Sequence, residues 1–218
     1  MQAAIYGLAG VDLGASEAAF FRDAKPAGYI LFRRNIVDRE QLLRLTDALR
    51  DLEGHDGVPI LIDQEGGRVA RMRPPEWPVF PSGEAFDRLY QLAPSSAIEA
   101  ARVNARALGL MLGEVGINVD CLPLLDVRQP GATDIVGDRA LGSEPMQVAA
   151  LGRAILDGLA SAGVLGVIKH IPGHGRALVD SHHELPHVDA TDEELAIDRK
   201  STRLNSSHAI PSRMPSSA

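Results

Sequence analysis

The stretch VPILIDQEGGRVAR, residues 58–71, joins a short apolar run to a cluster of charged residues and a pair of glycines. Its first part contains no polar residue before Asp63, which is typical of a strand that is buried on both faces of a parallel sheet. Asp63 and the polar residues that follow it fall where this strand should end. The stretch therefore predicts a parallel sheet with polar side chains gathered beyond one end.

Similar apolar runs occur elsewhere in the chain, at residues 3–11, 28–32, 117–124 and 166–171. Segments of helical period separate them, most clearly at residues 38–52, 95–115 and 145–162. This alternation predicts an α/β protein built from repeated βα units. We expect about five units of an incomplete (β/α)₈ TIM-type barrel, because a complete barrel needs roughly 250 residues. A complete, doubly wound sheet of five strands is the competing architecture.

Polar residues follow several of the predicted strands directly. They are Arg33, Arg34 and Asn35, then Asp63, Gln64 and Glu65, then Asp126, and finally Lys169 and His170. Ligands bind at the carboxyl ends of the strands in parallel α/β sheets and barrels. We therefore expect these clusters to converge on one face, which favours an enzyme.

The composition narrows the classes of ligand. The chain has 218 residues, 45% of them hydrophobic, and a formal net charge of −7, so it lacks the clustered positive charge that nucleic acid requires. It has no apolar run long enough to span a membrane. Cys121 is the single cysteine and cannot form an internal disulfide. These features predict a cytoplasmic protein that acts on a small molecule.

Domain organisation changes near the end of the chain. We expect residues 1–199 to form one domain, the N-terminal part of a barrel. Residues 200–218 are rich in serine and have no apolar periodicity, so we expect a disordered tail that is not native to the domain. Thr191 and Glu194 have the spacing of a capping box, which predicts a short helix just before it.

The stretch KHIPGHGRALVDSHHELP, residues 169–186, admits several kinds of site. Its possible metal ligands are His170, His174, Asp180, His182 and His183. Proline and glycines interrupt any helix that would place the first two histidines side by side. Ser181 is poorly placed as a nucleophile, because its immediate neighbours are too close in sequence to act on it. A polar loop without chemistry is the remaining simple reading.

A proton-transfer site is a further reading of the same stretch. Asp180 and His182 are two residues apart on a bent loop, so the carboxylate can accept a hydrogen bond from one ring nitrogen. The other nitrogen is then free to exchange a proton, and the raised imidazole pKa suits a general acid near neutral pH. The neighbouring glycines would let this loop move over a substrate.

Two other clusters supply polar contacts. Asp63 with Arg68 and Arg71 offers an acceptor and guanidinium donors, which commonly hold sugar hydroxyls and amides. An Asp–Arg ion pair that only fixes the loop is the alternative. The turn-rich segment DIVGDRALGSEP, residues 134–145, contributes Arg139 and is a weaker signal by itself.

Six motifs in this order and spacing resemble the β-N-acetylhexosaminidases of glycoside hydrolase family 3, of the NagZ type. They are LFRRN (31–35), IDQEGGRVAR (62–71), PLLDV (123–127), VGDRALGSEP (136–145), KHIPGHG (169–175) and DSHHELP (180–186). The resemblance implies a TIM-type barrel in the bacterial cytoplasm and no cofactor or metal. It also implies removal of terminal β-linked N-acetylglucosamine (GlcNAc) from muropeptides during peptidoglycan recycling.

The same resemblance implies a role for each matching residue. Substrate contacts fall on Asp63, Arg71, Arg139, Lys169 and His170. His182 becomes the acid/base and Asp180 its partner. A retaining glycosidase also needs a carboxylate nucleophile, which we expect this chain to lack, so the chain alone should be inactive. A GlcNAc-binding protein without chemistry and a metal-dependent hydrolase are the alternatives; the acceptor, the aglycone and the oligomeric state stay open.

Overall fold

The computed structural model describes residues 2–132, 134–171, 173–179, 185, 187–188 and 190–198. Asp180 and His182, the predicted proton-transfer pair, lie outside the described residues. So does the segment 200–218 that we expect to be a tail. The capping box is confirmed: the Thr191 N–H donates to Glu194 Oε2 at 2.8 Å, the Glu194 N–H donates to Thr191 Oγ1 at 3.3 Å, and residues 192–198 are helical.

Five parallel strands form one sheet in the order β1-β2-β3-β4-β5. The strands are β1 (Gln2–Gly7), β2 (Pro26–Leu31), β3 (Ile60–Ile62), β4 (Val119–Asp120) and β5 (Leu165–Gly166). A doubly wound sheet reverses its strand order at a switch point, whereas this order follows the sequence throughout. The fold is therefore a partial TIM-type (β/α) barrel, as the sequence predicted, and the doubly wound alternative was wrong.

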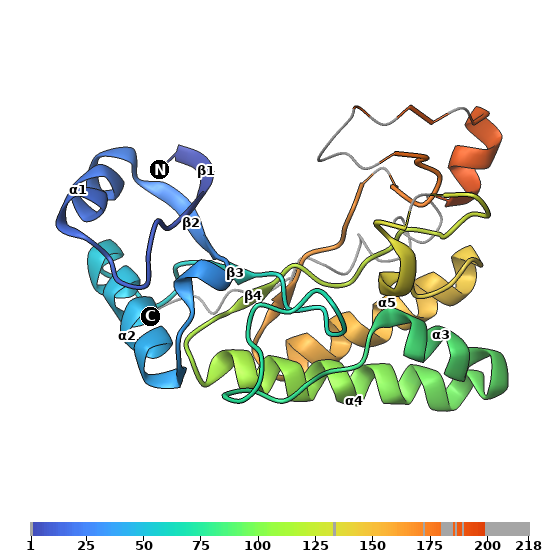
Figure 1. The fold of residues 1–218 in the computed structure, drawn as a ribbon, viewed down its shortest axis with the longest axis horizontal. Helices are drawn as coiled ribbons and strands as arrows, with labels where there is room; N and C mark the ends of the chain where they lie inside the picture. Colours follow the sequence, from blue (N-terminus) through green and yellow to red (C-terminus); the bar gives the residue numbers. More distant parts are fainter. Residues whose placement is uncertain are drawn as a thin grey trace, which may run out of the picture.

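Helices connect the strands and cover the sheet (Figure 1). They are α1 (Ala15–Ala24), α2 (Arg39–Glu53), α3 (Gly83–Leu92), α4 (Pro94–Gly113) and α5 (Pro145–Ser161). The helical periods at 38–52, 95–115 and 145–162 correspond to α2, α4 and α5. The sequence analysis missed α1 and α3, because each is only ten residues long and buries few residues.

Helix α2 shows how local sequence sets the boundaries of these elements. The Asp38 carboxylate accepts a hydrogen bond from the Gln41 N–H at 2.8 Å and caps the first turn. Gly54 ends the helix in the left-handed region with φ 74°. Leu42, Leu45 and Leu49 recur at helical spacing and are buried against the sheet.

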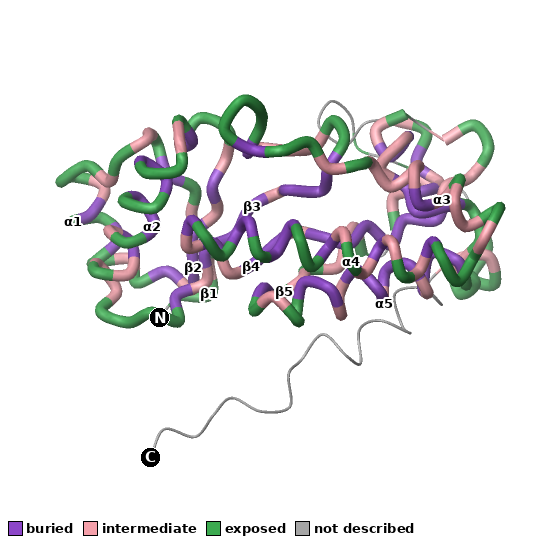
Figure 2. The backbone as a smooth tube through the Cα atoms, turned by 90° about the horizontal axis from the view of Figure 1, so that it is seen from below, coloured by how far each residue is buried: buried purple, intermediate pink, exposed green. Residues whose placement is uncertain are grey.

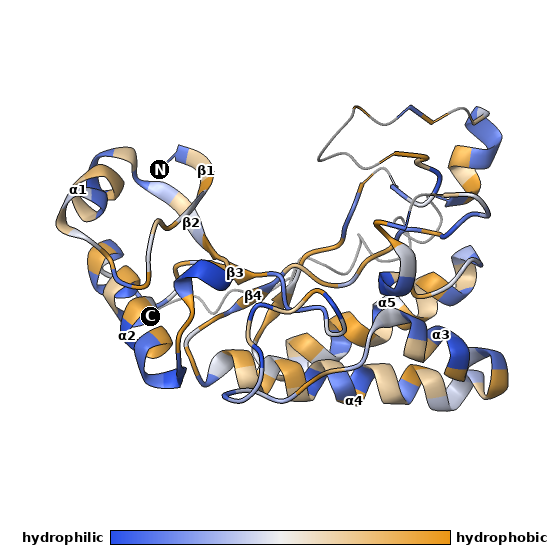
Figure 3. Ribbon diagram, in the orientation of Figure 1, coloured by the Kyte–Doolittle hydropathy of each residue, from blue (hydrophilic) through white to orange (hydrophobic). Residues whose placement is uncertain are grey.

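The core lies between the strands and helices α2, α4 and α5, where buried residues concentrate (Figure 2). Hydrophobic residues follow the same distribution, and alternate with polar residues along α4 and α5 (Figure 3). These two helices approach each other closely: a Cβ on Gly158 of α5 would stand 2.3 Å from the Arg102 carbonyl oxygen of α4. A small residue at this position is therefore required for their packing.

The strands differ from the sequence prediction in length and burial. The apolar runs 117–124 and 166–171 contain only two paired strand residues each, and pairing resumes in a bridge between Leu124 and Lys169. Strand β1 is half-exposed, with Ile5 49% exposed, because it lies at an edge of the described sheet. Within the described residues, no helix has the length and apolar character that a membrane span requires.

Candidate functional site

A cavity of about 460 Å³ opens beyond the carboxyl ends of β3, β4 and β5. It is lined by Asp63, Glu65, Val69, Arg71, Cys121, Ile135, Val136, Arg139, Val167, Lys169, His170 and His174. Five of these were predicted substrate contacts: Asp63, Arg71, Arg139, Lys169 and His170. The structure therefore brings together all the predicted contacts that it describes.

One side of the cavity is a row of alternating charges, which we call the charged row: Arg71, Asp63, Lys169, Glu65 and Arg139. Lys169 Nζ lies 3.0 Å from Asp63 Oδ1 and 2.5 Å from Glu65 Oε1. Arg71 Nη2 lies 3.1 Å from Asp63 Oδ2, and the Arg139 guanidinium makes two bonds to Glu65, of 2.8 and 2.9 Å. Every carboxylate in the row thus contacts two cations.

The row sets the protonation of its members. Burial opposes the ionisation of Asp63, but Lys169 and Arg71 outweigh it and hold the pKa of the Asp63 carboxyl below its ordinary value. Burial also disfavours the charged form of Arg139, yet its bonds to Glu65 raise the pKa of the guanidinium. All five groups are therefore charged at neutral pH, and the row contains two negative and three positive charges.

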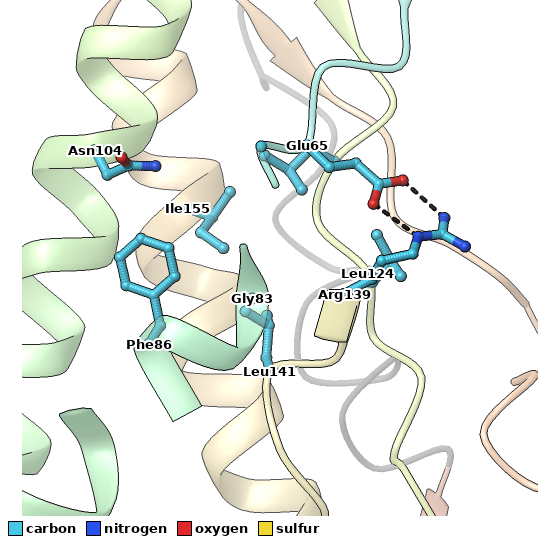
Figure 4. A pocket seen from close by; sticks show the side chains of 10 residues that line it. Glu65, Gly83, Phe86, Asn104, Leu124, Arg139, Leu141 and Ile155 are labelled. Carbon is cyan, nitrogen blue, oxygen red and sulfur yellow. Dashed lines mark hydrogen bonds and ion pairs between the residues drawn. The ribbon is translucent and has the colours of Figure 1, made fainter. Parts of the chain in front are cut away.

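Glu65 belongs to this row although the sequence analysis did not assign it a contact. Its side chain is only 5% exposed and faces Arg139 (Figure 4). On its other side lies a small cavity of about 20 Å³, bordered by Phe86, Asn104 and Ile155 from three helices. Its position two residues after Asp63 was the available signal, because alternate residues of an extended chain point to the same side.

The residue between the two carboxylates has a structural role. The Gln64 side chain points away from the row, accepts hydrogen bonds from the N–H groups of Arg71 and Met72, and donates to the Met72 carbonyl. Gly66 turns the chain with φ 97°, where a Cβ would stand 2.2 Å from the Pro81 carbonyl oxygen. These features return the chain so that Arg71 reaches Asp63.

Arg68 does not join Asp63, although the sequence placed it in the same cluster. Its Nε lies 2.7 Å from Asp138 Oδ1, and its Nη2 donates to the carbonyls of Asp134 and Ile135. Arg68 thus fixes the loop that carries Arg139. The polar residues after β2 also lie elsewhere: Asn35 donates to the Leu8 and Gly10 carbonyls.

The opposite side of the cavity, which we call the histidine side, consists of Asp126, His170 and His174. His170 Nδ1 lies 2.6 Å from Asp126 Oδ2, and the backbone N–H groups of His170 and His174 both donate to Asp126 Oδ1. Burial opposes ionisation of Asp126, but these bonds outweigh it and lower its pKa. Asp126 therefore orients the His170 ring, whose side chain is 40% exposed.

His174 contributes a ring whose two nitrogens are buried without a hydrogen-bond partner among the described residues. The ring centroid lies 6.3 Å from that of His170. The backbone following His174 is held close to the loop after β4, because the Gln129 N–H donates to the Gly175 carbonyl at 3.1 Å. This contact agrees with the prediction that His174 helps to shape the loop.

Two predicted features cannot be placed in this site. Asp180 and His182 lie outside the described residues, so the proton-transfer pair stays a prediction. The metal reading rested on these two residues and His183, which also lies outside. Among the residues that the structure does describe, no group of three or more histidines, cysteines and acidic residues is arranged to hold a metal ion.

A partial (β/α) barrel with a charged cavity at the carboxyl ends of its strands has the site location of TIM-barrel enzymes. Comparison with known families identifies which barrel it is. Residues 5–201 match the Glycosyl hydrolase family 3 N terminal domain, and the chain belongs to this family.

Curated relatives are the beta-hexosaminidases of Aromatoleum aromaticum, 38% identical over 179 residues, and of Bordetella avium, 36% identical over 181 residues. Each alignment covers 82% of this chain, which spans about half the length of these relatives (50% and 51%). NagZ from Neisseria gonorrhoeae, in complex with N-trifluoroacetyl-D-glucosamine, is 32% identical with a TM-score of 0.87. That match covers 93% of this chain and 60% of NagZ.

A second structural match is the glycoside hydrolase family 3 beta-N-acetylglucosaminidase from Paenibacillus sp. str. FPU-7. It is 31% identical with a TM-score of 0.83, over 92% of this chain and 38% of that protein. Both neighbours support the partial barrel described above.

Proposed function

We propose that this chain is the sugar-binding part of a retaining β-N-acetylhexosaminidase that removes terminal β-linked GlcNAc from muropeptides. The observation that carries the proposal is the charged row, which surrounds one cavity with residues at the positions that match the family. The similarity to beta-hexosaminidases, and to a NagZ bound to a GlcNAc analogue, supports this substrate class. We place the reaction in the cytoplasm, within peptidoglycan recycling.

The charged row suits a polar sugar because its groups are already oriented. Asp63 can accept hydrogen bonds from hydroxyls, while Lys169 and Arg139 can donate to sugar oxygens. Arg71 Nε is buried without a hydrogen-bond partner in the described part of the chain, so it is a donor in reserve for a ligand. Groups that hold one another in place before binding lose little freedom when a ligand arrives.

Proton transfer in this proposal belongs to the loop that follows His174. His182 would protonate the leaving oxygen, with Asp180 fixing its tautomer. His170, held by Asp126 at 2.6 Å, would present its other ring nitrogen to the sugar.

The nucleophile is the missing component of the proposal. A retaining reaction needs a carboxylate that attacks the anomeric carbon. Asp63 and Glu65 each contact two cations and Asp126 accepts three hydrogen bonds, so the described carboxylates of the cavity are all engaged. We propose that the nucleophile is not among residues 1–199, and that this chain binds the sugar without hydrolysing it.

Two assays test binding and chemistry separately. Titration calorimetry should detect GlcNAc binding and much weaker binding of glucose, which lacks the acetamido group. Incubation with a chromogenic N-acetylglucosaminide should release no product. Absence of GlcNAc binding would refute the sugar site, whereas measurable hydrolysis would show that the chain contains its own nucleophile. Binding of GlcNAc and glucose with equal affinity would argue against a hexosaminidase.

A further inference from the structure

Behind the charged row lies an aspartate with no counter-charge. Asp120 is the last residue of β4 and is fully buried. Its Oδ1 accepts a hydrogen bond from the Gln64 N–H at 3.0 Å, and its Oδ2 is buried without a hydrogen-bond partner among the described residues. Gln64 is the residue between Asp63 and Glu65, so Asp120 holds the backbone that carries both carboxylates of the row.

The nearby cations are already engaged. Lys169 is shared between Asp63 and Glu65, Arg71 binds Asp63, and Arg139 binds Glu65. None of the ion pairs found among the described residues includes Asp120. An ionised Asp120 would therefore be a third carboxylate without a contacting cation and with one oxygen lacking a donor, which is costly in a dry interior. A neutral carboxylic acid avoids the buried charge and still accepts the Gln64 hydrogen bond.

We propose that Asp120 is kept as a neutral carboxylic acid and acts as a positioning residue for the Asp63 and Glu65 carboxylates of the sugar site. The sugar-binding half of this inference rests on the proposed function; the protonation half does not. The neutral acid fixes the backbone at Gln64 while leaving Lys169 to the two carboxylates that face the cavity. An ionised Asp120 would compete with them for Lys169.

The surrounding charges agree with this assignment. Burial raises the pKa of Asp120 well above its ordinary range, and Glu65 and Asp63 at the end of β3 add to the rise. The Gln64 N–H and Lys169, from the segment after β5, act in the opposite direction without offsetting burial. The adjacent Cys121 thiol is also affected: burial raises its pKa to about 11, so it carries no charge at neutral pH.

Asp126 is a matched control only six residues away. It is also fully buried, yet it accepts hydrogen bonds from three donors and its pKa is lowered. The two aspartates should therefore respond to pH in opposite ways. Asp120→Asn and Asp126→Asn make the same chemical change in the two environments.

The first test is the melting temperature of wild type, Asp120→Asn and Asp126→Asn as a function of pH. A folded pKa above the unfolded value near ~3.9 makes wild-type stability fall as pH rises from that value toward the folded pKa. The melting temperature of Asp120→Asn should therefore rise relative to wild type across this range. For Asp126→Asn it should fall relative to wild type as pH rises, because an ionised Asp126 stabilises the fold.

A difference between Asp120→Asn and wild type that stays constant from about pH 5 upward would overturn the proposal, since an ordinary Asp is fully ionised there. If Asp120→Asn does not fold, infrared spectroscopy of the wild type at neutral pH provides the test. The carbonyl stretch of a protonated carboxylic acid should be present, and its absence would also overturn the proposal.

The second test separates positioning from protonation. Asp120→Asn keeps an oxygen acceptor for Gln64 and should bind GlcNAc within about twofold of wild type, whereas Asp120→Ala removes the acceptor and should bind about tenfold more weakly. Equal loss in both variants would refute positioning by a neutral acid. If wild type itself does not bind GlcNAc, the proposed function and the positioning role fail together, while the pH series still decides the protonation of Asp120.

Discussion

The two sides of the cavity hold their charges in different ways. In the charged row, two carboxylates and three cations neutralise one another, and Lys169 is central because it contacts both Asp63 and Glu65. On the histidine side, one carboxylate is satisfied by three donors, while the nitrogens of the His174 ring have no partner among the described residues. The row is thus a mutually dependent network, and the histidine side is a single anchor with less constrained rings.

The largest effect should come from breaking the row at its centre. Lys169→Met leaves two largely buried carboxylates facing each other with one cation fewer each. We expect a loss of about 3–5 kcal/mol in the free energy of unfolding, as for other buried pairs that lose one partner. Urea denaturation followed by circular dichroism measures it.

An exposed ion pair provides the control for this experiment. Arg44 and Glu40 pair on the surface of α2, with side chains 61% and 88% exposed. Arg44→Met should change stability by less than about 1 kcal/mol. Equal losses in the Lys169 and Arg44 variants would show that the row is not a dependent network.

A backbone change should disturb the histidine side. A Cβ on Gly175 would stand 2.0 Å from the Val127 carbonyl oxygen, so Gly175→Ala must displace the segment that follows His174. We expect a loss of about 1–3 kcal/mol from overpacking. Gly131→Ser is no suitable control, because its φ is 78°, whereas Gly14→Ala adds a Cβ in open space at normal φ. If Gly175→Ala melts at the same temperature as Gly14→Ala, this close contact is not as described.

Acid should weaken both sides of the cavity. Asp63 and Asp126 have folded pKa values below their unfolded ones, so their stabilisation is present above the unfolded pKa and is lost as pH falls through the folded pKa. Each contributes about 1–2 kcal/mol at neutral pH if its shift is about one unit. Urea denaturation between neutral pH and acid should show a smaller acid loss in Asp63→Asn and Asp126→Asn. Parallel curves for wild type and both variants would contradict this.

The smallest effect should come from His174. Its buried ring nitrogens have no described partner, so replacing the ring by an apolar one removes an unsatisfied polar group instead of a bond. We expect His174→Phe to stay within about 0.5 kcal/mol of wild type. His170→Phe, which loses the bond to Asp126, is the comparison and should lose more. A large destabilisation by His174→Phe would mean that the ring has a polar partner.

The sequence predicted the barrel because it depends on patterns that survive without tertiary information. The buried strands, the stripes of α2, α4 and α5 and the polar residues after each strand are all local. Strand length was not predictable in the same way. The apolar run 117–124 continues beyond the two residues that pair, and Pro123 within it has no N–H to donate.

The site could be predicted only in part. The five substrate contacts came from a family resemblance and from their places after strands. The roles of Glu65, Asp126 and Asp120 were missed, since each depends on a partner more than forty residues away in the sequence. A carboxylate looks the same in sequence whether it pairs with a cation, anchors a histidine or stays neutral. Only the packed structure distinguishes these three environments.

Titration calorimetry of GlcNAc with wild type and Asp63→Asn tests the central claim that the charged row binds the sugar. Asp47→Asn, on the exposed surface of α2, is the matched control. Wild type and Asp47→Asn should bind equally, and Asp63→Asn should bind about tenfold more weakly or worse, because it loses a charged acceptor. Equal binding by all three proteins would contradict the account.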